Sequence, residues 1–375
     1  MSPKKKSSGN QQGGLFRSTG RFLLGILVGA NVVSVVLLLL CGYSTMFHPK
    51  VCSILVGFGL TFPVYLAVCL FFLVFWAIFS ARFIWISIVG LVAGFGFIRT
   101  YCPINLPDPH PQGCIKVLSY NVKGFCIADR RSDAAEQFRR ILDYLRKSQA
   151  DIVCLQEYQY WPDQLGRQVE EVRNRWPYHD SLQLGTNAIG FWSRYPIIKR
   201  ERIRFSSTAH GSVAYTLRLG ASDTIIVINN HFVSNAISAE DKSLYKNMVK
   251  TPSEVNMKSN MGYFVRKVGR AGLRRSDQAD SVASYVERHA DKPIILCGDL
   301  NDSPIAYAHH RLTRSLNDAY VSSGFGPGIS YHEAGMYFRL DNILCSHHWK
   351  SYTATVDAEM DASDHYPIFC FLKKD

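Results

Sequence analysis

Residues 292–304 read Lys-Pro-Ile-Ile-Leu-Cys-Gly-Asp-Leu-Asn-Asp-Ser-Pro, a short apolar run that stops at Gly298 and is followed by Asp299 and Asn301. The unbroken apolar run predicts a buried strand. Because side chains alternate along an extended chain, Asp299 and Asn301 are expected on one side of it, at the strand's end. The same residues also suit an ordinary strand followed by an Asx-type turn. Other strand ends in the chain must decide between these two interpretations.

Further apolar runs also end in, or lie beside, polar side chains that suit metal and phosphate chemistry. Each one alone is ordinary, because Asn and Asp commonly close strands and a single Glu or His is most often a surface or hydrogen-bonded structural residue. Their recurrence at several strand ends is harder to explain by turn chemistry alone. The residues are Asn121, Glu157, His231, Asp341, Asp364 and His365.

The charge of the chain is concentrated near its N-terminus. The formal net charge is +12, yet the first hundred residues contain eight Lys or Arg and no Asp or Glu, which leaves +4 for residues 101–375. A high net charge therefore gives weak support to nucleic-acid binding by the C-terminal part, where a clustered basic face would be needed. Two basic runs, 199–204 and 266–275, are candidates for such a face, although charge runs usually form solvated surfaces.

Long apolar stretches indicate membrane segments before residue 100. Residues 1–21 are polar and basic and predict a disordered tail. Residues 22–99 contain three apolar stretches, about 22–42, 54–79 and 83–98, each long enough or nearly long enough to cross a bilayer. A cleaved signal peptide would explain the first stretch and leave the other two unexplained. The third is short and Gly-rich, so it could instead lie at the membrane interface.

Three crossings would fix the orientation of the protein. The basic N-terminus is expected in the cytoplasm by the positive-inside rule, which places the C-terminal domain outside the cytoplasm. If the third stretch does not span, that domain faces the cytoplasm instead. The sequence therefore predicts a multi-pass integral membrane protein in contact with the lipid bilayer, and it indicates no obligate protein partner.

A Pro-rich linker, residues 100–113, joins the membrane region to a domain at 114–375. Cys102 and Cys114 flank this linker and could pair in an oxidising compartment, which spacing alone cannot test. The domain has the pattern of an α/β protein. Strands are predicted at 115–120, 151–155, 188–193, 213–219, 224–228, 294–298, 339–345 and 368–372, helices at 134–147, 162–175 and 274–289, and a mobile insertion at 235–260.

The motifs together resemble one known group. Leu-Ser-Tyr-Asn121-Val, Asp-Ile-Val-Cys-Leu-Gln-Glu157, Asn-Asn-His231, Gly-Asp299-Leu-Asn301-Asp and Ser-Asp364-His365-Tyr-Pro occur in the order seen in the endonuclease/exonuclease/phosphatase superfamily, over about residues 114–374. This resemblance implies a DNase I-like α/β fold: a four-layer sandwich of two packed mixed β-sheets flanked by helices, with the active site at one rim. It also implies hydrolysis of a phosphate ester with Mg²⁺, or Mn²⁺, as the cofactor.

The resemblance further implies a role for each motif residue. Asn121, Glu157 and Asp364 would hold the metal, with Glu157 as the best direct ligand for a hard cation. Asp299 would activate the attacking water, and Asn301 would hold a phosphoryl oxygen. His365, oriented by Asp341, would donate to the transition state. His231 would contact a phosphate or protonate the leaving group. Asn342 departs from the aromatic residue or His often found after this Asp.

Several substrates stay open on the sequence alone. A membrane-anchored endonuclease-like phosphodiesterase acting on nucleic acid is one expectation, and a phospholipid or sphingomyelin phosphodiesterase acting on a lipid head group is another. A polyphosphate phosphatase of the same fold is a third. A catalytically silent domain that binds a phosphorylated ligand is the alternative from a different class, although it has no need of a water-activating Asp299.

Overall fold

The computed structural model describes residues 9–127, 133–159, 164–185, 187–205, 210–235, 237–251, 257–333 and 335–374. The chain divides into two compact units, Met1–Tyr43 with Thr61–Ile98, and Ser44–Leu60 with Arg99–Asp375. The segment between the first two long helices thus belongs to the C-terminal unit. We describe each unit by itself.

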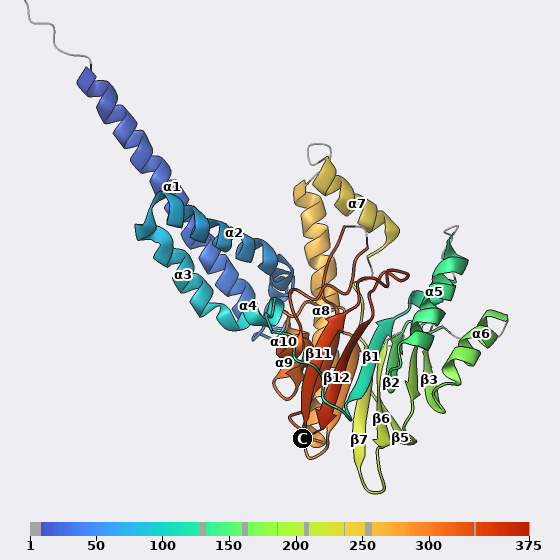
Figure 1. Cartoon of the computed structure of the whole chain (residues 1–375). Helices are drawn as coiled ribbons and strands as arrows, with labels where there is room; N and C mark the ends of the chain where they lie inside the picture. The colour runs from blue at the N-terminus through green and yellow to red at the C-terminus, as the bar shows by residue number, and fades with distance from the viewer. Residues whose placement is uncertain are drawn as a thin grey trace, which may run out of the picture. The chain divides into compact units, whose positions relative to one another are not determined.

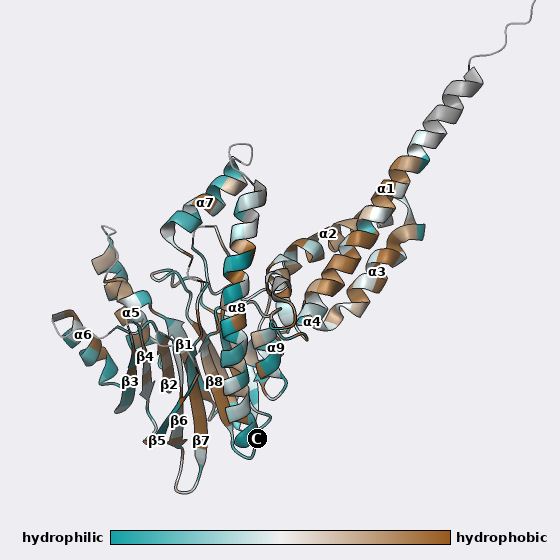
Figure 2. Ribbon diagram, turned by 180° about the vertical axis from the view of Figure 1, so that it is seen from behind, coloured by the Kyte–Doolittle hydropathy of each residue, from teal (hydrophilic) through white to brown (hydrophobic). Residues whose placement is uncertain are grey.

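Apolar helices make up the first unit. They are α1 (Gly9–Ser44), α2 (Phe58–Phe79), α3 (Ile84–Ala93) and α4 (Phe95–Tyr101), and Figure 2 colours most of their length as hydrophobic. Two stretches, Thr19–Ser44 and Leu55–Phe79, are long and apolar enough to cross a membrane. The pair α3 and α4 passes the same test only when it is taken as one span, because the two helices are bent by 66° where they meet.

The packing of these helices fixes their relative directions. Along α1, Asn31 accepts a hydrogen bond from Ser87 of α3 over 3.2 Å, and Tyr43 meets Phe97 of α4 with ring centroids 5.0 Å apart. The two contacts advance in the same sense along both segments, so the chain from α3 to α4 runs in the same general direction as α1. The contacts with α2 advance in opposite senses: Ser34 lies against Cys69, and Cys41 against Thr61. The helix α2 is therefore antiparallel to α1.

The predicted disordered tail differs from the structure in its second half. Residues 1–8 lie outside the described residues, and from Gly9 the chain is already part of α1. The sequence pattern measures hydrophobicity, and low hydrophobicity argues only against burial of a segment. Backbone hydrogen bonds that continue from an apolar helix can nevertheless extend it into polar residues, since propagation is easier than nucleation.

The second unit confirms the predicted sandwich, with two six-stranded sheets packed face to face (Figure 1). The first sheet has the order β11-β12-β1-β2-β4-β3 and the second β5-β6-β7-β8-β10-β9. Both sheets mix parallel and antiparallel pairs. Their strands are β1 (Ile115–Asn121), β2 (Ile152–Gln156), β3 (Tyr178–Leu184), β4 (Asn187–Ser193), β5 (Ile197–Ile203), β6 (Gly211–Arg218), β7 (Thr224–His231), β8 (Ile294–Asp299), β9 (Asn317–Asp318), β10 (Asp341–Cys345), β11 (Trp349–Val356) and β12 (Ile368–Lys374).

Three apolar clusters hold the four layers together. The central one lies between the sheets and includes Val117, Phe191, Tyr215 and Cys297. The other two lie between a sheet and its helices. The outer helices are α5 (Ala134–Lys147) and α6 (Gln164–Arg173) on the first sheet, and α8 (Met257–Arg288) and α9 (Tyr307–Thr313) on the second, with the short α10 (Ala319–Ser323) following β9.

The predicted mobile insertion at 235–260 is wrong for most of its length. Helix α7 (Ala239–Lys250) begins there with a capping box, in which the Ser238 side chain accepts from the Asp241 backbone and Asp241 accepts from the Ser238 backbone. Helix α8 then starts at Met257, well before the predicted start at Arg274. Residues 236 and 252–256 lie outside the described residues. The Ser-x-x-Asp spacing is a sequence signal for a helix start, and the weak apolar periodicity of α7 hid it.

The predicted strands and helices otherwise lie where the pattern placed them, and the omissions are mostly at sheet edges. The basic run at 199–204 is largely strand β5, an edge strand. Edge strands commonly carry charges, so their apolar alternation is weak. In the linker, Asn105 donates hydrogen bonds to the carbonyls of Val321 and Gly324, over 3.1 and 2.7 Å. Cys102 and Cys114 are both free thiols and do not form the disulfide considered from the sequence.

Candidate active site

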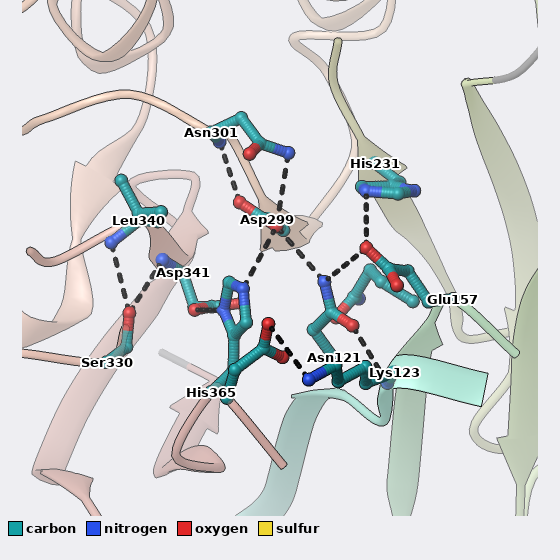
Figure 3. Close-up of polar contacts among 12 residues, drawn as sticks. Asn121, Lys123, Glu157, His231, Asp299, Asn301, Ser330, Leu340, Asp341 and His365 are labelled. Atoms are coloured by element: carbon teal, nitrogen blue, oxygen red, sulfur yellow. Dashed lines mark hydrogen bonds and ion pairs between the residues drawn. The ribbon is translucent and has the colours of Figure 1, made fainter. Parts of the chain in front are cut away.

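Strand pairing brings the polar strand ends to one rim of the sandwich. In the first sheet β1 and β2 are parallel, with Asn121 beside Gln156, the residue before Glu157. In the second sheet β7 and β8 are parallel, and His231 lies beside Asp299. Strand β10 runs antiparallel to β8 and starts at Asp341, again opposite Asp299. In Figure 3 these side chains point toward a common centre.

Gly298 shapes the end of the central strand. Its φ of +134° is open to glycine alone, and a Cβ at this position would lie 2.0 Å from the Asn230 carbonyl oxygen. This close approach of β8 to β7 sets the Asp299 carboxylate directly beside His231. The glycine in the opening motif is therefore required by packing at the site.

Three residues at the site have left-handed backbone conformations: Lys123, Glu157 and Asn301, with φ of 47°, 51° and 51°. Side-chain-bearing residues rarely adopt this region, and they do so mostly where the surrounding structure imposes it. Each of the three lies one or two residues after a strand end, so its side chain is placed at the rim. The local sequence alone does not specify these turns.

Asn121 links the two carboxylates of the site. Its Nδ2 donates to Glu157 Oε1 over 3.3 Å and to Asp299 Oδ2 over 3.2 Å. Burial raises the pKa of Glu157, and the nearby Asp364 raises it further. Burial, together with the charge of Asp341, also raises the pKa of Asp299 to about 6. A carboxyl with such a pKa can take up a proton near neutral pH.

His365 forms the closest ion pair of the site. Its Nδ1 donates to Asp341 Oδ2 over 2.7 Å, and its Nε2 lies 3.8 Å from Asp299 Oδ2. Burial lowers the pKa of this imidazole, but the carboxylates of Asp341 and Asp299 outweigh burial and raise it to about 10. A charged imidazolium therefore faces Asp299, with its free N–H available as a donor.

His231 is buried with no hydrogen-bond partner on either ring nitrogen among the described residues. Its Nε2 is 3.8 Å from Glu157 Oε1, and its ring lies 4.9 Å from that of His210. Burial lowers its pKa, so the ring is neutral. Unpaired buried nitrogens are rare in proteins because each costs free energy, and at a site rim they indicate a place for a ligand.

Asn301 lies beside Asp299, as the alternation argument predicts, although it reaches this place through a turn. Its backbone N–H donates to Asp299 Oδ1 over 2.7 Å, and its Nδ2 donates to Asp299 Oδ2 over 3.1 Å and to the Phe232 carbonyl over 3.0 Å. The amide hydrogens of Asn301 thus hold the carboxylate of Asp299 in place.

Asp364 lies at the site and faces a lysine. Its Oδ2 is 3.8 Å from the ammonium nitrogen of Lys123, and the same nitrogen is 3.8 Å from Glu333 Oε1. Burial raises the pKa of Asp364, but His365 and Lys123 outweigh it and lower this pKa overall. The carboxylate of Asp364 is therefore ionised at neutral pH.

The donor set fits a hard divalent cation. Glu157 and Asp364 offer ionised or readily ionised carboxylates beside the Asn121 amide, and oxygen donors of this kind are what Mg²⁺ prefers. A second set, Asp299, Asp341 and His365, also has ligand atoms within 4.8 Å of one another. A protonated imidazole cannot ligate a metal, so the raised pKa of His365 makes this second set an acid–base cluster.

Sequence patterns missed residues that support this site from outside. Ser330 Oγ accepts from the backbone N–H groups of Leu340 and Asp341, both over 3.0 Å, and the Tyr331 ring lies 5.1 Å from His365. Both come from a long loop without a strand-end signal. Arg275 is buried, and its Nε lies 3.0 Å from Asp302 Oδ2.

Neither basic run forms the single exposed face considered from the sequence. Lys199 pairs with Glu201 over 3.0 Å, and Arg200 pairs with Asp180 over 2.9 Å. In the second run Lys267 pairs with Asp241, and Arg275 is in the interior. Part of the positive charge in each run is thus already neutralised within the protein.

Known proteins match both parts of the chain. The Endonuclease/Exonuclease/phosphatase family matches residues 118–365, and a domain family of unknown function matches residues 23–101. An exodeoxyribonuclease of Bacillus subtilis is 27% identical over 291 residues, covering 68% of this chain and 98% of that protein. A solved endonuclease/exonuclease/phosphatase of Beutenbergia cavernae has a TM-score of 0.50 at 16% identity, covering 70% of this chain and 72% of its own. The human Nocturnin catalytic domain, solved with a bound sulfate anion, has a TM-score of 0.49 at 16% identity, covering 70% and 95% of the two chains.

Proposed function

This chain belongs to the endonuclease/exonuclease/phosphatase family and is a phosphoric ester hydrolase, and we propose that it is a membrane-anchored, Mg²⁺-dependent phosphodiesterase in which Asp299 activates water. One observation carries the proposal. The buried Asp299 carboxylate lies 3.2 Å from the Asn121 amide and 3.8 Å from the His365 imidazolium, so a base, a proposed ligand residue and a cationic donor meet at one point.

Family members generally use a divalent metal, and in this chain Glu157, Asp364 and the Asn121 amide would hold it. When bound, the cation would neutralise charge on the phosphoryl oxygens. Mg²⁺ is the ion we propose because all of these donors are oxygen atoms.

Asp299 has the position and the pKa of a general base. Two N–H groups of Asn301 fix its carboxylate, and its pKa of about 6 leaves it mostly ionised at neutral pH yet able to accept a proton. Water would give a proton to Asp299 as its oxygen attacks phosphorus. The phosphorus–oxygen bond to the alcohol then breaks and the departing alkoxide takes a proton from solvent, so the products are a phosphate monoester and an alcohol, and Asp299 releases its proton to water.

The other residues would stabilise charge as it develops. The Nε2–H of His365 points toward Asp299 and is placed to donate to a phosphoryl oxygen, and Asp341 keeps the ring charged. His231 is neutral, buried and unpartnered, which suits a hydrogen bond to the leaving or phosphoryl oxygen. These roles agree with the residues named from the sequence, and Asn301 acts chiefly by positioning Asp299.

The test is turnover of bis(p-nitrophenyl) phosphate by the purified full chain in detergent. We expect activity that depends on added Mg²⁺, and a loss of about 10²–10⁴-fold in kcat for Asp299→Asn. The exposed Asp291→Asn is a matched control for removal of a carboxylate. Equal turnover by Asp299→Asn and the native chain would sink the assignment, and no turnover on any phosphate ester would favour a silent phosphate-binding domain.

A nucleic-acid strand is the substrate class with the most support. The curated relative that spans most of the domain is an exodeoxyribonuclease. The lipid alternatives rest only on the apolar helices, which raise the local concentration of lipid without recognising it. A panel of single-stranded DNA, RNA, sphingomyelin and phosphatidylcholine decides between them, because cleavage of lipid alone would exclude the nuclease.

The fold also supports three crossings of the membrane. The segment Ser44–Leu60, between α1 and α2, packs on the catalytic domain: His48 Nε2 lies 3.2 Å from Asp280 and Lys50 Nζ lies 2.6 Å from Asp277. If α1 and α2 both cross, this segment and the domain share one side of the membrane. The bent pair α3–α4 must then cross as well, to return the chain to that side at Arg99.

We place the basic N-terminus in the cytoplasm and the catalytic domain outside it, following the positive-inside rule. Epitope tags at the two ends of the chain, probed with protease in sealed vesicles, test this arrangement. One tag should be protected and the other digested. Two tags with equal accessibility would mean an even number of crossings.

A further inference from the structure

The segment Ser44–Leu60 joins the two long apolar helices, yet it belongs to the same compact unit as the active site. Its side chains His48 and Lys50 reach Asp280 and Asp277 of α8, over 3.2 and 2.6 Å. Contacts between partly exposed charges are worth little free energy. The close packing of this segment on the domain therefore has to come from other contacts.

Two glycines bring the segment and the domain into close contact. A Cβ at Gly59 would lie 1.6 Å from the carbonyl oxygen of Ile305, in the turn between β8 and α9. A Cβ at Gly272, on α8, would lie 2.2 Å from the Val56 side chain. By contrast, no atom of the described residues lies within 4 Å of a Cβ added at Gly57. The contact thus requires glycine on both of its sides, at specific positions.

Little space is left between the segment and this turn. A cavity of about 10 Å³ remains where Phe47 and Leu55 of the segment face Asp302 and Ala306 of the turn. Such a volume is about the room that one water molecule needs. A displacement of the segment would therefore be passed on to the turn, because there is no free space to absorb it.

The turn that the segment contacts is the one that carries Asn301. Its backbone is bonded step by step: the Ile305 N–H donates to Ser303 Oγ, and the Ser303 N–H donates to Asp302 Oδ1, both over 3.1 Å. Asn301 comes next and holds the Asp299 carboxylate through two N–H groups. Its left-handed backbone conformation depends on the surrounding structure. The contact at Ile305 is thus linked to Asp299 through neighbouring residues of one turn.

We propose that the segment Ser44–Leu60 is a brace of the active site: it clamps the turn after β8 and so positions Asn301 against the Asp299 carboxylate. The inference rests on the proposed function, in which Asp299 is the base. Gly59 and Gly272 are positioning residues, since they act through Asn301. The connection between the two apolar helices thereby takes part in catalysis, in addition to joining those helices.

A methyl group on either glycine should displace the turn and lower turnover. In Gly59→Ala and Gly272→Ala, kcat for bis(p-nitrophenyl) phosphate should fall on the order of 10- to 100-fold, because a small misplacement of a catalytic group costs that much. KM should stay near its native value, since the groups proposed to bind phosphate keep their places. Ala is a better helix former than Gly, so a loss in Gly272→Ala cannot come from a weaker α8.

Each variant has a matched control of the same chemistry. Gly57→Ala lies in the same segment as Gly59→Ala, and its added methyl group meets open space. Gly262→Ala lies on α8 like Gly272→Ala, and its Cβ would meet only the end of the flexible Arg266 side chain, at 3.4 Å. Both controls should keep the native kcat, and all variants are compared as full chains in detergent.

Val56→Ala provides a rescue from the opposite side of the contact. The two γ-carbons of Val56 lie 2.2 and 3.1 Å from a Cβ at Gly272, and this change removes both of them. The double variant Gly272→Ala/Val56→Ala should therefore recover much of the kcat that Gly272→Ala loses. A residue needed only for folding would give no such recovery of kcat at a temperature where every variant is folded, which thermal denaturation establishes.

Hydrogen exchange reports the state of the turn without any turnover. The amide hydrogens of Asn301, Ser303 and Ile305 are all hydrogen-bonded in the native turn, and mass spectrometry measures their exchange in the full chain. Exchange in this peptide should be faster in Gly59→Ala than in the native chain, and unchanged in Gly57→Ala.

Native kcat and native exchange in both Gly59→Ala and Gly272→Ala would overturn the brace while the proposed function stands. A double variant that is no more active than Gly272→Ala would overturn it as well. If Gly59→Ala does not fold, Gly272→Ala and its rescue by Val56→Ala decide. If the native chain hydrolyses no phosphate ester and the turn still exchanges faster in Gly59→Ala, the proposed function fails while the brace of the turn stands.

Discussion

His365 donates through Nδ1 to Asp341 over 2.7 Å, and Asp341 is itself held by Ser330, whose hydroxyl oxygen accepts from the Asp341 backbone N–H. The imidazole is buried, and burial alone would make it neutral. The ion pair reverses this effect and gives a pKa of about 10. The contact with Asp341, together with the Asp299 carboxylate, thus keeps this buried ring a cation where burial alone would leave it neutral.

Replacing Asp341 by Asn should lower the pKa of His365 by about one to three pH units, because a carboxylate in contact is lost while Asp299 remains. Long-range ¹H–¹⁵N NMR of the metal-free protein measures this pKa directly. In the native chain the pKa is raised above the unfolded value of 6.5. The ion pair therefore stabilises the fold fully below pH 6.5, and this stability is lost as the pH rises through 10. A His365 that stays charged to the same pH in Asp341→Asn would contradict this role.

Arg275→Met should destabilise the domain by about 3–5 kcal/mol, because it leaves the buried Asp302 without its partner. Arg275 also donates to the Val233 carbonyl over 3.2 Å and to the Asn235 side chain over 2.9 Å, so it ties the loop after His231 to the turn after Asn301. Chemical denaturation measures the effect, and the exposed neighbour Arg274→Met is the control.

The double variant Arg275→Met/Asp302→Asn separates a lost ion pair from lost packing. It should recover part of the lost stability, because the unpaired carboxylate is gone. If the double variant loses as much unfolding free energy as the two single variants combined, the loss of the Arg275–Asp302 ion pair does not explain the destabilisation.

The sequence predicts the sandwich and the rim well because both depend on short-range patterns. The central strands are continuous apolar runs, and their polar ends at Asn121, His231 and Asp299 stand out against them. Parallel pairing then brings such ends together without further information. The sequence pattern did not predict the edge strand β5, because its exposed charges hide the apolar alternation. It did not predict α7, because only the capping pair Ser238 and Asp241 marks the start of that helix.

The parts of the site that could not be predicted depend on long-range contacts. Lys123 and Glu333 are far apart in the chain and become partners only through the fold. Ser330 acts on Asp341 from a loop with no regular pattern. The left-handed conformation of Glu157 is imposed by the surrounding structure, and nothing in the local residues requires it.

Gly298→Ala should destabilise the domain strongly. The new Cβ would lie 2.0 Å from the Asn230 carbonyl oxygen, and a φ of +134° adds backbone strain of about 1–3 kcal/mol. Either β8 moves away from β7 or the strand end unfolds, and both would displace Asp299. Gly220→Ala is the control, since its Cβ would meet only an ordinary contact with Asp223. A native denaturation midpoint for Gly298→Ala would mean that the rim is more adaptable than its geometry indicates.

Gly90→Ile tests whether α3 packs against α1 in the first unit. A Cβ at Gly90 would lie 2.5 Å from the Val35 side chain on α1, and helices in lipid rely on such small residues for close approach. We therefore expect a lower thermal transition of the full chain in detergent and faster proteolysis between α2 and α3. Gly25→Ile on α1 is the matched control, because no atom lies within 4 Å of its added Cβ. Equal stability of the two variants would mean that α3 does not pack closely against α1. The packing between these helices would then no longer support a third crossing.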